Sequence, residues 1–168
     1  MAEKDIELTE VEEREDILNN EMDYLAGLLD AADNANRQTK RIEIVRGGKL
    51  YFAFSVHSLS EEEIEEIRKK YTKYAKSRRN GIRVAEEVNG PKFKASLIFN
   101  STVEEDQEKL WDNEKVKKAL SAKGYVIINA LDVIETVLLP GEKTKIIDIL
   151  DEMNGYDNEE VKIVTAKN

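Results

Sequence analysis

Few side chains in this sequence could do chemistry, and they do not cluster. The 168 residues include one His, His57, and no Cys, so a Cys-based zinc site, a thiolate nucleophile and a multi-His metal site are excluded. The close carboxylates lie beside a predicted helix start, where such groups usually face solvent: Glu61, Glu62, Glu63, Glu65 and Glu66. Gly47-Gly48 is not followed by the Lys-Ser/Thr of a phosphate-binding loop. We therefore predict no catalytic, cofactor-binding or metal-binding residue, and a protein that is not an enzyme.

Charge is distributed unevenly along the chain. The sequence has 26 Lys+Arg and 35 Asp+Glu, a formal net charge of −9. Residues 1–35 hold 12 acidic and two basic groups, a net of −10, which leaves a net of +1 for the rest. An acidic segment is repelled by phosphate backbones. It suits solubility, or pairing with a basic protein surface.

The acidic segment is predicted to form a helix with one apolar stripe. Val11, Leu18, Met22, Leu25 and Leu29 recur at spacings of 7, 4, 3 and 4, which predicts a helix from about residue 9 to 32. Asn34 and Asn36 mark its predicted end. The stripe must be covered by the rest of the chain or by another copy. We take residues 1–36 as an acidic helical arm, with Leu18, Met22, Leu25 and Leu29 as the first candidate partner-binding surface.

A basic segment has the opposite bias. Seven of the twelve residues in RKKYTKYAKSRR, positions 68–79, are Lys or Arg, and none is acidic. We take Arg68, Lys69 and Lys73 as a basic helix face and the second candidate partner-binding surface. The alternative is a nucleic-acid-binding regulator that uses residues 68–83, which predicts salt-sensitive retention of DNA or RNA.

The first half of the remaining chain predicts a β-hairpin followed by a helix. Apolar residues alternate on both sides of Gly47-Gly48, which suit a two-residue turn, so residues 41–56 read as a hairpin. Ser60 and Glu63 form a predicted capping box. The helix that follows is expected to reach Ala75, with Ile64, Ile67, Tyr71 and Tyr74 on its buried face. Residues 77–91 read as a turn-rich loop.

The second half predicts helices. Residues 92–103 fit either a strand or a helix. A short helix is expected after Asp112 or Asn113 and closed by Gly124, then a longer apolar one over 126–138. Pro140 begins the next helix, which Gly155 ends. The predicted fold is α+β and predominantly helical: one β-hairpin packed with a helical bundle over 37–168, plus the N-terminal acidic helix.

Several segments occur in an order typical of one family. These are YFAFSV, SLSEEEIEEIRKKYTK, KFKASLIFNSTVEE and, after an apolar helix, LLPGEKTKIIDILDEMNGYD. The series resembles the XkdN-like tail assembly chaperones of phages and prophages over roughly residues 50–168. The most specific parts are Leu138-Leu139-Pro140-Gly141-Glu142 and Asn154-Gly155-Tyr156.

The resemblance implies a function. Proteins of this family bind the long, aggregation-prone tape measure protein, keep it soluble and help tail-tube protein assemble around it. They need no cofactor, act in the bacterial cytoplasm and are absent from the finished virion. The family also implies a longer product made by frameshifting near Ala166-Lys167-Asn168. A structural virion component is a further alternative. No apolar run approaches the ~20 residues of a membrane span, and the acidic N-terminus lacks a signal-peptide core.

Overall fold

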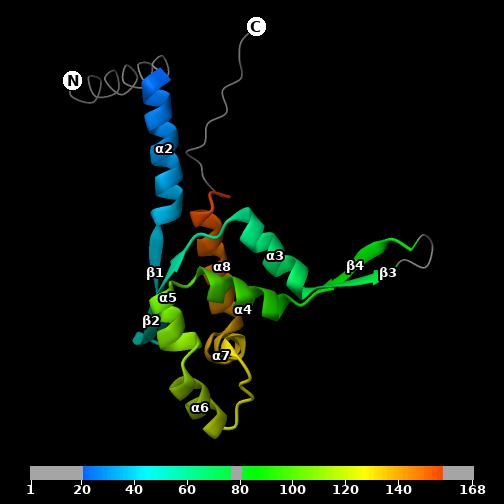
Figure 1. Cartoon of the computed structure of the whole chain (residues 1–168). Helices are drawn as coiled ribbons and strands as arrows, with labels where there is room; N and C mark the ends of the chain where they lie inside the picture. The colour runs from blue at the N-terminus through cyan, green and yellow to red at the C-terminus, as the bar shows by residue number, and fades with distance from the viewer. Residues whose placement is uncertain (1–20, 77–80, 157–168) are drawn as a thin grey trace. The chain divides into compact units, whose positions relative to one another are not determined.

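The computed structural model describes residues 21–76 and 81–156 (Figure 1). Internal contacts divide the chain into two units, Met1–Gln38 and Thr39–Asn168. The first contains α2 (Glu21–Arg37), which is the described part of the predicted arm helix. This helix continues past Asn34, where an end was predicted, and the Gln38 side-chain amide donates to Asn34 Oδ1 at 3.2 Å. Such a pair, four residues apart, supports the last turn.

The second unit begins with the predicted hairpin. Strands β1 (Thr39–Arg46) and β2 (Lys49–His57) are antiparallel, with Ile42 opposite Phe54. Gly47 and Gly48 have φ values of +57° and +77°, as a tight hairpin turn between right-twisted strands requires. Only glycine adopts such values at little cost. The hairpin prediction is therefore confirmed.

Helix α3 (Glu61–Tyr71) begins as predicted and ends early. The Glu63 amide donates to Ser60 Oγ at 3.2 Å, and the Ser60 amide donates to Glu63 Oε2 at 2.7 Å, which completes the capping box. The predicted extension to Ala75 is wrong. Thr72 is extended, and its hydroxyl donates to the Arg68 carbonyl at 2.6 Å, which satisfies one of the last carbonyls of the helix.

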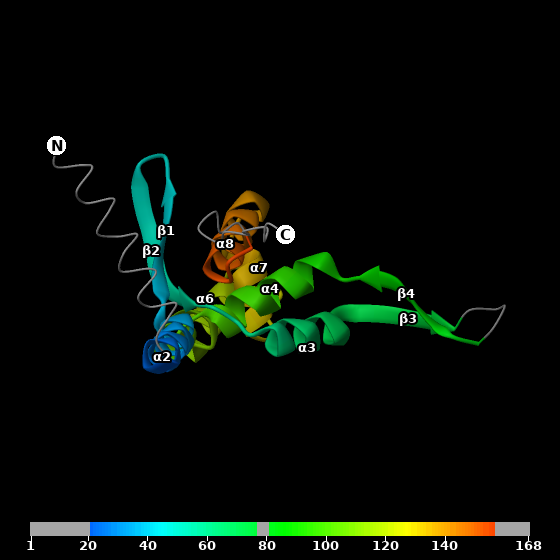
Figure 2. The same cartoon turned by 90° about the horizontal axis from the view of Figure 1, so that it is seen from above.

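A second hairpin replaces the predicted end of that helix and most of the predicted loop. β3 (Thr72–Lys76) pairs with β4 (Arg83–Val88) in antiparallel register. The Asn89 amide donates to the Tyr71 carbonyl at 2.9 Å and closes the base of the pair. Figure 2 shows this hairpin extending away from α3. Tyr74 is exposed on β3, so its predicted core position is wrong: cross-strand hydrogen bonding replaced the helical period on which that prediction rested.

The ambiguous segment 92–103 is helical as far as Ser101. In α4 (Gly90–Ser101), the Asn89 side chain accepts from the Lys92 amide at 3.2 Å, and Pro91 lies in the first turn, where its missing N–H costs nothing. The short α5 (Glu104–Asp106) continues into a π-helical turn, η1 (Gln107–Trp111). Asn113 caps α6 (Glu114–Ala122) and Gly124 follows it at φ +97°, both as predicted.

Helix α7 (Ala130–Val137) is shorter than the predicted helix over 126–138. The Asp132 amide donates to Asn129 Oδ1 at 3.3 Å, and the Asn129 amide donates to Asp132 Oδ2 at 3.1 Å. This capping box fixes the start at residue 130, which leaves Val126 and Ile128 exposed. The predicted corner then leads into α8 (Pro140–Met153), which buries Ile146 and Leu150.

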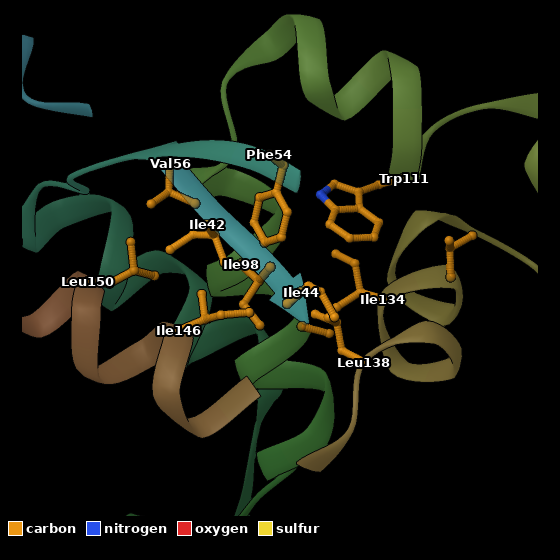
Figure 3. Packing of buried hydrophobic residues seen from close by; sticks show 12 residues of the cluster. Ile42, Ile44, Phe54, Val56, Ile98, Trp111, Ile134, Leu138, Ile146 and Leu150 are labelled. Atoms are coloured by element: carbon orange, nitrogen blue, oxygen red, sulfur yellow. The ribbon is translucent and has the colours of Figure 1, made fainter. Parts of the chain in front are cut away.

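The β1–β2 hairpin shares one core with α4, η1, α7 and α8 (Figure 3). Phe54 from β2 meets Trp111 from η1 edge-on, with ring centroids 5.2 Å apart. The Trp111 indole N–H donates to Thr102 Oγ1 at 3.1 Å, so its one polar group is satisfied inside the core. Three helices add further large buried side chains to this core: Ile98 (α4), Ile134 (α7), and Ile146 and Leu150 (α8). The predominantly helical α+β prediction is confirmed.

Candidate partner-binding surface

Helix α2 carries an exposed apolar stripe. Tyr24, Leu25, Leu28 and Leu29, called the α2 stripe below, are 46%, 61%, 67% and 59% exposed. They lie on adjoining positions of the helix, because residues three or four apart share a face. An exposed apolar stripe of this kind is a candidate docking surface.

The predicted arm residues fall partly within this stripe. Leu25 and Leu29 belong to it, whereas Leu18 and the side chain of Met22 lie outside what the structure describes. Tyr24 and Leu28 were not predicted. Tyr24 and Leu28 are four residues apart, a helical spacing that was visible in the sequence. Each lies one position before a member of the predicted apolar series, Leu25 or Leu29.

The predicted basic face spans two elements. Arg68 and Lys69 lie in the last turn of α3, but Lys73 lies on β3, so the three do not form one helix face as predicted. All three are exposed, as is Lys70. The guanidinium of Arg68 forms an ion pair with Glu65 and lies 5.9 Å from the centre of the Phe93 ring. We call Arg68, Lys69, Lys70 and Lys73 the basic surface.

An open groove lies beside Arg68. It encloses about 340 Å³ between α3, α4 and α8. Arg68 from α3 and Asp151 from α8 also line it, and its apolar lining comprises Leu59, Ile64, Phe93, Leu97, Ile147 and Leu150. We call it the α3–α4–α8 groove. Sequence reasoning missed it, because its lining comes from three segments and each apolar residue looked like ordinary core.

Ion pairs hold the walls of the groove in place. Lys92 at the start of α4 bonds Asp132 at 2.7 Å and Glu135 at 2.6 Å, which ties α4 to α7. Partial burial opposes the charge on Lys92, but these hydrogen bonds outweigh it and raise the pKa of the ammonium group. The same contact lowers the pKa of the Asp132 carboxyl.

A second ion pair fixes α8 against the first hairpin. Arg46 Nε and Nη2 donate to the two oxygens of Glu142 at 2.7 and 2.8 Å, and Nη2 also donates to the Val137 carbonyl at 2.7 Å. This two-bond geometry is the strong form of an Arg–carboxylate pair. The hydrogen bonds from Arg46 lower the pKa of the Glu142 carboxyl, against the opposing effect of burial.

The residues considered in the sequence as candidates for catalysis or metal binding lie at the surface or at the end of a strand. His57 Nδ1 lies 2.8 Å from the Ser58 carbonyl oxygen at the end of β2. The Glu61, Glu62, Glu63 and Glu66 side chains are exposed. Across residues 21–76 and 81–156, no group of three or more His, Cys, Asp or Glu side chains is arranged to hold a metal ion. None of the helices described there is long and apolar enough to cross a bilayer.

A comparison with known protein families places the chain in a family. The family model described as phage XkdN-like tail assembly chaperone protein matches residues 25–167. The chain belongs to this family. No curated protein and no solved structure matches it. The match starts at Leu25, earlier than the predicted resemblance over 50–168, so this XkdN-like chaperone shares most of α2 with its family.

Family membership gives the general role. This XkdN-like protein is a phage tail assembly chaperone by family. The match takes in Leu25, Leu28 and Leu29 of the α2 stripe and all four residues of the basic surface.

Proposed function

We propose that this chaperone binds the tape measure protein, keeps it soluble, and helps tail-tube protein assemble around it. The observation that carries the proposal is the α2 stripe, in which three leucines are each about three-fifths exposed or more. A long helical partner exposes apolar side chains of the same kind before it is packed in a tail. Covering them with α2 removes apolar surface from water on both molecules.

The size of the stripe suits a reversible contact. Burial of apolar surface contributes roughly 25 cal/mol per Å², and association costs several kcal/mol in lost freedom of motion. A four-residue stripe therefore gives modest affinity at one site. Many copies along one long partner hold it firmly, and each is released when tail-tube protein provides a better cover.

We infer that the protein acts by binding and not by catalysis, in the cytoplasm of the bacterial host, and is absent from the mature virion. Membership of a tail assembly chaperone family supports this assignment. A structural virion component is the competing assignment. Mass spectrometry of purified particles separates the two, because a structural component would be present in fixed proportion to the tail-tube protein.

Co-expression tests the proposal. The tape measure protein of the same phage or prophage is expressed alone, with this chain, and with the Leu25→Gln/Leu29→Gln variant. We expect the soluble fraction of the tape measure protein to rise with the wild-type chain and not with the variant. Ala26→Gln is the matched control, because Ala26 is exposed on α2 outside the stripe. Equal solubility with and without the chain would refute the proposal.

A further inference from the structure

We propose that the arm of one copy docks on the chaperone domain of a second copy. In this contact the α2 stripe lies in the α3–α4–α8 groove of the second copy, and the acidic side chains of α2 lie near its basic surface. The partner is thus a second copy of this chain. Two independent properties, apolar surface and charge, match between the two surfaces.

The apolar match joins a stripe to a groove. Tyr24, Leu25, Leu28 and Leu29 project from a helix of 17 residues, and the groove offers an apolar floor that includes Phe93 and Leu97. An amphipathic helix lying in an apolar groove, with anchors at i, i+3 or i+4, is a common mode of peptide recognition. The two surfaces are therefore matched in apolar character.

The charge match is between segments of one sequence. Residues 1–35 carry a net charge of −10, whereas residues 68–83 contain eight Lys or Arg and no acidic residue. Asp30 and Asp33 follow Leu29 on α2, and Arg68 on the groove wall begins the basic surface. Docking of α2 in the groove therefore brings an acidic segment near a basic one, which favours this pairing over other partners.

The same charges argue against nucleic acid as the occupant of the basic surface. A chain of net charge −9, with its acidic excess in one arm, repels a phosphate backbone as a whole. A second copy of the chain brings an acidic segment to the basic surface. Nucleic acid is therefore an alternative result of the test below.

Self-docking also has a consequence for partner binding, which rests on the proposed function. The surface that covers tape measure helices would be protected in the resting protein, so self-association and partner binding would compete. The experiment below contains no tape measure protein. Its failure would therefore leave the proposed function standing, and its success would not depend on that function.

Sedimentation velocity of the full-length chain over a range of concentrations tests the proposal. We expect dimers or larger species that dissociate as salt rises from about 0.05 to 0.5 M, where screening shortens the range of charge interactions. Lys69→Glu/Lys73→Glu and Asp30→Lys/Asp33→Lys should each weaken association by about tenfold or more, because attraction becomes repulsion. An equimolar mixture of the two variants should restore it, since each then meets an opposite charge.

The matched control changes the same charge elsewhere. Lys115→Glu/Lys118→Glu replaces two exposed lysines on α6 and should leave association unchanged. Circular dichroism checks that all variants keep the wild-type helix content. The proposal is overturned if the wild-type chain is monomeric at every concentration, if the mixture fails to restore association, or if the α6 control weakens it equally. The proposal would also be overturned if the wild-type chain is monomeric and binds a DNA oligonucleotide, and if Lys69→Glu/Lys73→Glu abolishes that binding.

Discussion

Replacing two leucines of the α2 stripe should weaken partner binding strongly without unfolding the protein. Leu25 and Leu29 are 61% and 59% exposed, so folding leaves most of each side chain in water. Leu25→Gln/Leu29→Gln therefore removes little buried surface from the folded chain. Leu and Gln both have good helix propensity, so the free energy of unfolding should change by less than about 0.5 kcal/mol.

The effect on binding follows from the same exposed fractions. Full burial of a leucine side chain is worth roughly 1.5–3 kcal/mol, and about three-fifths of that remains to be gained when a partner covers the residue. Each leucine thus contributes about 1–2 kcal/mol to binding, and the pair about 2–4 kcal/mol. This corresponds to a Kd raised roughly 30- to 900-fold.

A competition assay measures this effect directly. Wild-type and variant chains are mixed in equal amounts with tagged tape measure protein, and the captured ratio is read by mass spectrometry. We expect the wild type to dominate the captured material, and Ala26→Gln to be captured as well as the wild type. Capture of the double variant within about threefold of wild type, with unfolding free energy unchanged, would refute the assignment of this stripe, since the burial estimate requires far more.

Three further changes test the fold that holds the surfaces. Phe54→Ala leaves a cavity at a fully buried site against Trp111 and should lower the free energy of unfolding by about 3–5 kcal/mol. Urea unfolding followed by Trp fluorescence measures this loss, and a loss under about 1 kcal/mol would contradict the core described. Arg46 lowers the pKa of the Glu142 carboxyl in the folded protein below its value in the unfolded chain. The ion pair therefore stabilises the fold fully above the pKa of the unfolded chain, and this stabilisation is lost as the pH falls through the pKa of the folded protein. Unfolding free energy should therefore decline below about pH 4, less steeply in Glu142→Gln, and superimposable pH curves would contradict this contribution. Gly48→Ala, at φ +77°, should lower the melting temperature through about 1–2 kcal/mol of strain, and Gly48→Asn should lower it less; equal melting temperatures would disprove the turn geometry.

Local signals in the sequence predicted much of the fold. Ser60 with Glu63, Asn113 with Gly124, Gly47-Gly48 and Pro140 each fix a cap or a turn through contacts within a few residues. Such signals act on neighbours, so they can be read from one segment. The Asn129–Asp132 capping box was equally visible, and the apolar run 126–138 concealed it.

The errors arose where distant partners decide the conformation. Thr72 to Lys76 fit a helix by period, but pairing with β4 makes them a strand. The α3–α4–α8 groove needs Phe93 and Ile147 to meet Ile64 across the fold, which no local pattern predicts. The α2 stripe was half predicted, because its apolar spacing is local and only its exposure depends on the fold.

Transient shielding of the tape measure protein is the central claim, and quantitative mass spectrometry across tail assembly tests it most directly. Tagged tape measure protein is isolated from infected or induced cells before tails are complete, and again as finished particles. We predict that several copies of this chain accompany each tape measure protein in the early complexes and that none remains in the particles. A chain absent from the early complexes, or retained in the particles in fixed ratio to the tape measure protein, would contradict the claim.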